Sequence, residues 1–267
     1  MARDKDVLPA LTERTVLTLM DWPRHCAEDG VKAMLPRLPP RLGAAALGLA
    51  SHWSFRLGRL GFRGAAPPAA LEHFVRHRCI FVHIPKCAGT SVSRTLSDRP
   101  ALHWKLSYYR LVFQPDAFRD YFKFAFVRNP WDRLVSAYQY LREPTDLVAE
   151  SDVAWAKRHL ARYADFADFA LHGLPRWEVR RWLTFVPQHE FVTLPWRRGP
   201  QVDFIGKVED IGRDWPWVAQ RLGLPPGLGT FNRSRRAAGY RGYYTPQTRA
   251  MVARVYAEDI RMFGYEF

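Results

Sequence analysis

The feature that most constrains the fold is a pattern that occurs twice: an apolar, strand-like run that leads into a helix. "CIFVHI" (79–84) precedes "TSVSRTL" (90–96), and "FKFAFV" (122–127) precedes "RNPWDRLVSAYQYL" (128–141). A short apolar run such as "CIFVHI" is typical of a strand that is buried on both faces of a parallel sheet, and "FKFAFV" is also strand-like. Strands that alternate with helices predict an α/β domain whose central, mainly parallel sheet is flanked by helices.

Later segments continue this alternation. "FVTL" (191–194) and "VDFIG" (202–206) have the composition of a third and a fourth strand. Thr245 and Pro246 are typical of the cap and first position of a helix. We expect this last helix to carry an apolar face formed by Met251, Val252, Val255, Tyr256 and Ile260.

The chain divides near residue 78. Residues 1–78 contain helix-like patches interrupted by prolines and carry no chemical motif. The Pro- and Ala-rich stretch 64–70 is typical of a boundary. We therefore predict a helical N-terminal extension of unknown role (1–78) and one main domain (79–267).

Charge and cysteine usage restrict the partners and the compartment. Forty Lys and Arg residues against 26 Asp and Glu residues give a net charge of +14, which favours an anionic partner. Nucleic acid, an acidic membrane surface and a phosphorylated cofactor all fit this charge. The cysteines Cys26, Cys79 and Cys87 show neither a disulfide framework nor a zinc-binding spacing. Together with acidic residues in the first twenty positions, they lead us to expect a cytoplasmic protein.

One stretch of the extension bears on membrane contact. The uncharged run Leu42–Phe55 is shorter than the ~20 residues that a membrane-spanning helix needs. Arginines and aromatic residues alternate over 53–63. Both a helix packed on the main domain and a helix at the membrane interface fit this pattern, so peripheral membrane contact stays open.

The residues between the first strand and its helix suggest an anion site. A loop that leads into a helix N-terminus presents unpaired backbone N–H groups, and the helix dipole favours negative charge there. In "FVHIPKCAGTSV" (81–92), Gly89 lets a backbone come close to a ligand, Thr90 and Ser91 add hydroxyl donors, and Lys86 adds a positive charge. This pattern predicts a phosphate cradle.

The second strand-to-helix unit offers a partner for a second phosphate. Arg128 follows the strand directly, and Ser136 lies eight residues later on the predicted helix. A guanidinium fork and a hydroxyl are good phosphate ligands. Paired with the first loop, this otherwise weak pattern becomes a strong indication of a second phosphate site.

Two other classes of protein remain as alternatives. A P-loop nucleotide kinase is disfavoured because Lys86 precedes Gly89, whereas the lysine of a Walker A loop follows its glycine. No aspartate for magnesium is apparent on a later strand. A basic nucleic-acid-binding protein would explain the net charge, but the chain contains no recognition motif for nucleic acid.

The two phosphate motifs resemble those of the sulfotransferases that use 3′-phosphoadenosine 5′-phosphosulfate (PAPS), in the carbohydrate (family 2-like) branch. "FVHIPKCAGTSV" is similar to the 5′-phosphosulfate loop of that family, and "FKFAFVRNPWDRLVSAYQYL" to its 3′-phosphate segment. The resemblance extends over 79–267 through "PQHEF" (187–191), "VDFIGKVED" (202–210) and "FNRSRRAAGYRGYYT" (231–245). It departs from the family at Cys87 and Ala88, where many members have Thr and Gly, and at Lys207, where arginine is common.

The resemblance implies a P-loop-like three-layer fold and transfer of a sulfuryl group from PAPS to a hydroxyl of a carbohydrate or glycolipid acceptor, with PAP as the product and without a metal. The donor-binding residues that it implies are Pro85, Lys86, Cys87, Ala88, Gly89, Thr90, Ser91, Arg128, Ser136 and Arg241. We expect "NRSRR" (232–236) and nearby tyrosines to close over the nucleotide, although a solvated charge run also fits.

The chemistry requires a base for the acceptor proton, and histidine suits neutral pH. Related enzymes carry a catalytic histidine after the phosphosulfate loop, at the place of His103, so we assign His103 and Lys86 as catalytic residues. His83, His172 and His189 are the alternatives. Trp177, Arg180, Arg181 and Trp182 are candidates for an acceptor site or for an ordinary helix surface. The acceptor and the oligomeric state are not predicted.

Overall fold

The structure of the chain, a computed structural model, describes residues 71–97, 102–113, 115–143, 148–195, 197–229 and 239–267. The predicted helical extension lies almost entirely outside these ranges, and so do the Arg- and aromatic-rich stretch 53–63 and the basic run 232–236. Backbone contacts divide the chain into two compact units, residues 1–79 with 107–121, and residues 80–106 with 122–267. The boundary predicted at residue 78 stays a prediction.

The described part of the first unit is built from short helices. They are α3 (Glu72–His77), most of α5 (Leu106–Val112) and α6 (Pro115–Asp120). The ring centroids of Phe74 and Tyr109 lie 5.6 Å apart, and those of Phe113 and Tyr121 also lie 5.6 Å apart. Aromatic contacts therefore make up much of this unit's small core.

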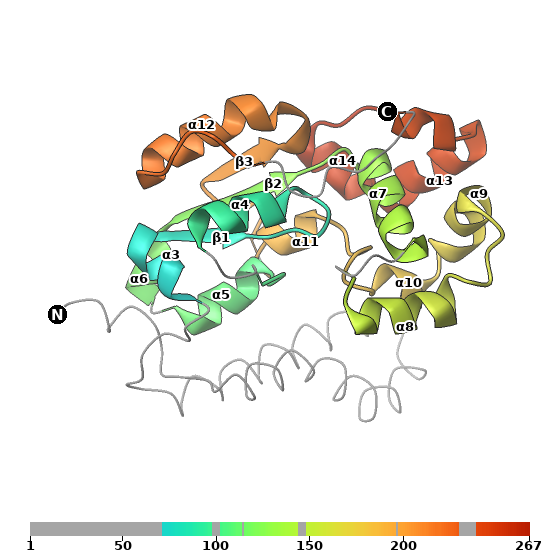
Figure 1. The fold of residues 1–267 in the computed structure, drawn as a ribbon, viewed down its shortest axis with the longest axis horizontal. Helices are drawn as coiled ribbons and strands as arrows, with labels where there is room; N and C mark the ends of the chain where they lie inside the picture. The colour runs from blue at the N-terminus through green and yellow to red at the C-terminus, as the bar shows by residue number, and fades with distance from the viewer. Residues whose placement is uncertain (1–70, 98–101, 114, 144–147, 196, 230–238) are drawn as a thin grey trace. The chain divides into compact units, whose positions relative to one another are not determined.

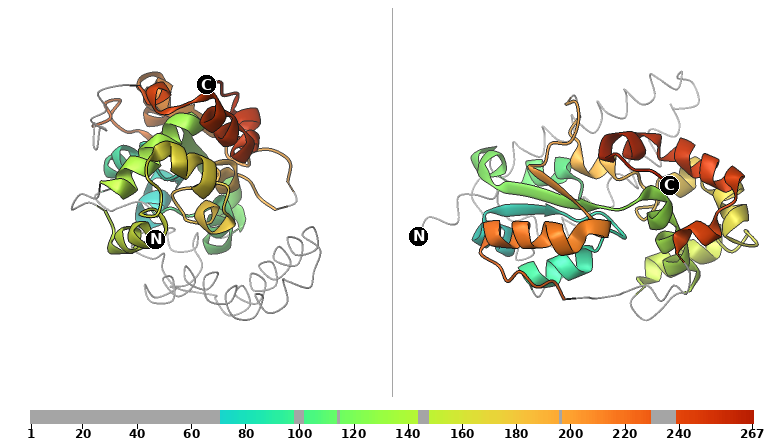
Figure 2. Two further views of the ribbon diagram at one scale, coloured as in Figure 1. Left: turned by 90° about the vertical axis from the view of Figure 1, so that its right-hand side faces the viewer. Right: turned by 90° about the horizontal axis from the view of Figure 1, so that it is seen from above.

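The second unit contains the sheet. Strands β1 (Cys79–Val82), β2 (Phe122–Val127) and β3 (Phe204–Lys207) lie in the order β1-β2-β3, and β2 pairs with β3 in parallel, with Phe124 opposite Phe204. All residues of β1 and β2 are buried, as the apolar runs predicted. Helices flank the sheet, with α4 (Gly89–Leu96) and α12 (Ile211–Leu222) on one face and α11 (His189–Val192) on the other (Figure 1, Figure 2). The predicted α/β class is confirmed.

A second core surrounds α7 (Pro130–Arg142). Apolar residues of α7, among them Trp131 and Leu134, pack with Phe169, Phe185 and Val252. The elements after α7 are α8 (Glu150–His159), α9 (Phe166–Asp168), the π-helix η4 (Phe169–Gly173), α10 (Trp177–Arg180), the 3₁₀ helices η5 (Val208–Asp210) and η6 (Tyr240–Tyr243), α13 (Pro246–Val255) and α14 (Ala257–Phe263). Pro130 is at the start of α7, and the side chain of Asn129 accepts the N–H groups of Trp131 and Asp132 as the helix cap.

Two predicted elements are wrong. "FVTL" (191–194) is not a strand, because Phe191 and Val192 end the short helix α11, whose first residues donate backbone N–H groups to the carboxylate of Asp259. The final helix does begin at Pro246 with Thr245 as its cap. It is not continuous to Ile260, however, because it ends at Val255 and α14 begins at Ala257, so that Tyr256 separates the two helices.

Candidate functional site

The predicted phosphate cradle forms a tight loop between β1 and α4, here called the anion loop (residues 85–91). Lys86 and Ala88 both adopt positive φ, 67° and 57°, a left-handed conformation that is unusual for residues with a side chain. Alternation of left- and right-handed residues turns successive backbone N–H groups toward one concavity, which favours an anion. Helix α4 begins at Gly89, and the dipole of its N-terminus also favours negative charge at the loop.

Gly89 is required for a reason that the sequence did not indicate. A Cβ at this position would lie 1.7 Å from the ring of His83. The buried His83 ring thus packs against the backbone at the start of α4, where the sequence led us to expect a ligand. His83 also stacks on Phe81, with 5.7 Å between the ring centroids.

The charged end of Lys86 lies over an aromatic ring of α7. Its Nζ is 4.0 Å from the centroid of Tyr140, within the range of a cation–π contact. Its backbone carbonyl accepts a hydrogen bond from Nη1 of Arg128 at 3.3 Å. The two predicted phosphate-binding segments are therefore in direct contact.

Cys87 faces the protein interior. Its thiol donates to Oε1 of Gln188 at 3.2 Å, and burial raises its pKa to about 12. Such a thiol stays protonated and unreactive at neutral pH. The backbone N–H of Cys87 donates to the carbonyl of Ile84 at 3.3 Å, so the predicted donor contact of Cys87 stays a prediction.

The second predicted segment, here called the Arg128 segment (residues 128–136), leads from β2 into α7. Nε of Arg128 forms an ion pair with Oδ2 of Asp132 at 2.7 Å, which holds the guanidinium in place. Ser136 is buried two turns along the same helix. Arg128 thus lies just before α7 with its guanidinium held in place, and Ser136 lies in the middle of the same helix.

The structure brings His103 close to the anion loop. The ring centroids of His103 and His83 are 4.1 Å apart, and an ion pair between Lys105 and Glu190 at 2.5 Å ties the same segment to α11. Burial and the positive charges of Lys86 and Arg133 lower the pKa of His103 to about 4. His103 is therefore neutral at pH 7 and has a free lone pair for a proton.

Two of the three alternative histidines, His172 and His189, have acidic partners. His172 contacts Asp168 at 2.8 Å on the exposed side of the π-helix η4. Nδ1 of His189 lies 2.6 Å from Oδ1 of Asp259. Burial opposes a charge on His189, but the hydrogen bond and the negative charge of Asp259 outweigh burial and raise its pKa.

Arg241 lies near the described C-terminal residues. Its Nη2 donates to the backbone oxygen of Phe267 at 3.1 Å. The rest of η6 is attached to α7, since Tyr243 Oη accepts from Gln139 at 2.6 Å and the following Tyr244 donates to the carbonyl of Trp131 at 2.9 Å. This places Arg241 on a segment that packs on the helix carrying Ser136.

The candidate acceptor residues divide into two groups. Trp182 stacks on Trp155 at 5.0 Å and donates from its indole to Asp152 at 2.9 Å, so it belongs to the core around α7. Trp177 is exposed and lies under the guanidinium of Arg181 at 4.7 Å. Arg180 and Arg181 are exposed as well, so Trp177 and the two arginines are the accessible members of the candidate acceptor set.

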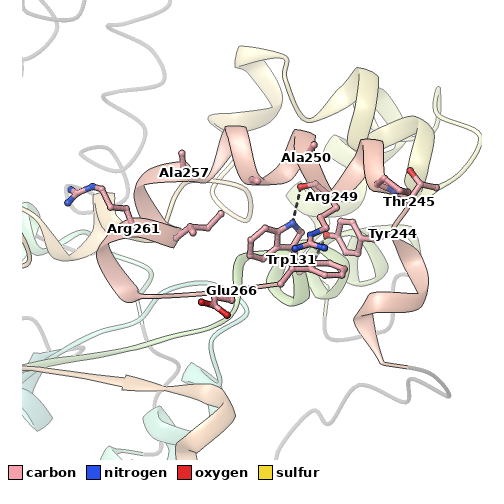
Figure 3. Close-up of a pocket in the computed structure, with 12 residues that line it drawn as sticks. Trp131, Tyr244, Thr245, Arg249, Ala250, Ala257, Arg261 and Glu266 are labelled. Atoms are coloured by element: carbon pink, nitrogen blue, oxygen red, sulfur yellow. Dashed lines mark hydrogen bonds between the residues drawn. The ribbon is translucent and has the colours of Figure 1, made fainter.

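One pocket of the second unit lies away from the predicted site residues. It has a volume of about 870 Å³ and is bordered by Trp131, the first turns of α13, and α14 (Figure 3). Arg249 covers Phe267 at 4.4 Å there, and its carbonyl accepts from the indole of Trp131 at 3.1 Å. None of the predicted donor-binding or catalytic residues lines this pocket.

Sequence reasoning missed three buried polar residues that hold the site. Gln188 and Asp259 have no exposed surface, and Arg133 is 2% exposed. Gln188 lies within "PQHEF", a stretch noted only for its resemblance to the family. Arg133 lies five residues after Arg128, and no spacing rule separates such an arginine from a surface residue.

In the ranges that the structure describes, no helix is long and apolar enough to cross a membrane. Within the same ranges, no group of three or more His, Cys, Asp or Glu side chains is placed to hold a metal ion.

Comparison with known proteins identifies the family. A sequence model of the sulfotransferase family matches residues 74–266. Carbohydrate sulfotransferase 10 of Pongo abelii is 24% identical over an alignment of 239 residues that covers 72% of this chain and 65% of that relative, so the chain spans about 65% of the relative's length. No solved structure matched the chain. The match to the family model covers well over half of the chain, including the anion loop and the Arg128 segment, and the chain therefore belongs to the sulfotransferase family.

Proposed function

We propose that this protein transfers a sulfuryl group from PAPS to a hydroxyl group of a carbohydrate. The observation that carries the proposal is the direct contact between the anion loop and the Arg128 segment, which supports two anion sites that lie side by side. The donor would supply the sulfuryl group, and its two phosphorylated ends match two such sites. Family membership supports the reaction type, and the name of the relative supports the carbohydrate acceptor.

The residues present fit this donor. The backbone N–H groups of the anion loop and the charge of Lys86 suit the 5′-phosphosulfate end. The guanidinium of Arg128 and the hydroxyl of Ser136 suit the 3′-phosphate, and the bond from Arg128 to Asp132 orders the guanidinium before an anion arrives.

Each catalytic residue has one task in the proposed reaction. Lys86 neutralises the charge that develops on the phosphate oxygen as the bond from that oxygen to sulfur breaks. His103 accepts the proton of the acceptor hydroxyl as its oxygen forms the new bond to sulfur. The neutral state of His103 in the free protein agrees with this role.

Thermal melting of the protein in the presence of different ligands tests the proposed identity of the donor. PAP should raise the melting temperature in the absence of metal, whereas ATP with magnesium or an oligonucleotide should raise it little. A large shift with the oligonucleotide and none with PAP would favour the nucleic-acid-binding alternative. Labelled PAPS offered with sugar, glycolipid and phenol acceptors would then identify the acceptor.

The role of His103 is tested by substitution. His103→Ala should leave PAP affinity nearly unchanged and reduce turnover by roughly 10²–10⁴-fold, the usual contribution of a positioned base. His172→Ala, a change at an exposed histidine, is the matched control and should keep normal turnover. Near-normal turnover of the His103 variant across the pH range would show that His103 is not the base.

A further inference from the structure

A buried glutamine joins the anion loop to the Arg128 segment. Oε1 of Gln188 accepts two hydrogen bonds, from the backbone N–H of Arg128 at 2.8 Å and from the thiol of Cys87 at 3.2 Å. Nε2 of the same side chain donates to the carbonyl of Arg128 at 2.8 Å. One amide group thus contacts both predicted phosphate-binding segments.

The amide takes the place of a neighbouring strand. β2 ends at Val127, and its pairing with β3 ends at the same residue, opposite Lys207. The N–H and C=O groups of Arg128 therefore lie beyond the ladder, where a partly buried backbone needs partners. The side chain of Gln188 supplies one donor and one acceptor in the geometry of a peptide group and so fixes the backbone at the start of the Arg128 segment.

Gln188 is itself held firmly. Its backbone N–H donates to Oδ2 of Asp259 at 2.8 Å, and the N–H of His189 donates to Oδ1 at 2.9 Å. Asp259 lies on α14 and has no exposed surface. The glutamine is therefore anchored from an element that belongs to neither phosphate-binding segment.

Two arginines make further links between the same segments. Nε of Arg133 donates to the carbonyl of Pro85 at 3.0 Å, and Nη1 of Arg128 donates to that of Lys86 at 3.3 Å. Links at Pro85, Lys86 and Cys87 leave the anion loop little freedom to move away from α7. Buried and partly buried hydrogen bonds thus set the spacing between the anion loop and the Arg128 segment.

We propose that Gln188 is a positioning residue that fixes this spacing, so that both phosphorylated ends of one nucleotide are bound at the same time. This inference rests on the proposed function, because a nucleotide phosphorylated at both the 3′ and 5′ positions is the ligand that gains from it. Once one end is bound, the other binds as an intramolecular event, and its gain depends on the geometry of the two sites. A change at Gln188 therefore affects a two-ended ligand more than a one-ended ligand.

Calorimetric titration of wild type and Gln188→Met with PAP, adenosine 5′-phosphate and adenosine 3′-phosphate tests the inference. Methionine keeps the length of the side chain and removes its hydrogen bonds. The dissociation constant for PAP should rise about tenfold or more, while those for the two monophosphates should change less than about threefold. Gln201→Met is the matched control, since Nε2 of Gln201 also donates to backbone carbonyls, those of residues 198–200, and all three constants should stay unchanged.

Gln188→Glu covers the case in which the methionine variant does not fold. A protonated glutamate can replace both the acceptor and the donor of the amide, and burial favours the protonated form. Its PAP affinity relative to wild type should therefore recover as the pH falls. Equal losses of affinity for all three ligands, or an unchanged affinity for PAP, would overturn the proposed role of Gln188 but not the proposed function. Failure of the wild-type protein to bind PAP would instead overturn the proposed function, and this inference with it.

Discussion

At the scale of single residues, the anion loop combines conformational strain with close packing. Ala88 adopts a left-handed conformation immediately before α4, a position at which many members of the family have glycine. A residue with a Cβ pays roughly 1–2 kcal/mol for this conformation. The loop therefore keeps its shape against a local preference, through its links to α7 and Gln188.

Ala88→Gly should stabilise the protein slightly. Release of the left-handed strain is partly offset by the larger conformational entropy of glycine in the unfolded chain, about 0.4–1 kcal/mol, so the net gain should be about 0.5 kcal/mol. Ala137→Gly, a change in the middle of α7, should lower the free energy of unfolding by about 1 kcal/mol or more. Denaturant unfolding measures both changes in the free energy of unfolding. A loss of stability in Ala88→Gly similar to that in Ala137→Gly would contradict the inference that Ala88 is strained.

The sequence identified the anion loop but not the direction of its side chains. Lys86, Gly89 and the helix start follow from local pattern, because a strand, a glycine and a hydroxyl cap have recognisable signatures. The contact of the Cys87 thiol with Gln188 joins residues 101 positions apart, and the packing of His83 on Gly89 depends on the backbone path. Neither leaves a periodic signal in the sequence.

At the scale of elements, β1 and β2 were predictable because each is a short apolar run that is buried on all sides. The same reasoning failed for "FVTL", since a short apolar run also fits a buried helix end. The choice between strand and helix depends on a residue that is distant in the sequence. Asp259 accepts hydrogen bonds from the backbone N–H groups of Gln188 and His189 and so favours the start of the helix α11. Tertiary contacts overrode local propensity there.

Asp259→Asn should therefore change how stability depends on pH. Asp259 raises the pKa of His189 above its value of about 6.5 in the unfolded chain. Because the folded state then binds the proton more tightly, this contribution is fully present below pH 6.5 and is lost as the pH rises through the folded pKa. The difference in the free energy of unfolding between wild type and variant should shrink over that range, as measured by denaturant unfolding between pH 5.5 and pH 8.5.

His189→Gln is the control for this prediction. It removes the titrating group but keeps Asp259 and its bonds to the backbone N–H groups. Its unfolding should lack the same pH-dependent contribution while it retains more stability than Asp259→Asn. A difference between wild type and Asp259→Asn that does not vary with pH would show that His189 is not coupled to Asp259.

At the scale of the second unit, the site joins segments that are far apart in the sequence. The anion loop, His103, the Arg128 segment, Gln188 and Asp259 come from five separate stretches between residues 85 and 259. Burial lowers the pKa of His103, and the positive charges of Lys86 and Arg133 lower it further because both oppose its protonation.

An anionic ligand beside Lys86 should reverse part of that effect. Negative charge next to the lysine offsets the field that disfavours protonated His103, so the pKa of His103 should rise from about 4 toward its ordinary value of about 6.5 when PAP binds. By linkage, PAP binding should then be accompanied by proton uptake between about pH 4.5 and pH 6.5, and lower pH should favour binding in that window. Titration calorimetry in buffers of different ionisation enthalpy measures the number of protons taken up.

His103→Gln is the necessary comparison, because the phosphates of PAP also titrate in this range and contribute equally to both proteins. The wild-type protein should take up more protons than the variant at pH 5.5, and the two should agree at pH 8. Equal proton uptake at both pH values would mean that the bound nucleotide does not act on His103 electrostatically, and the placement of His103 beside the transferred group would be wrong.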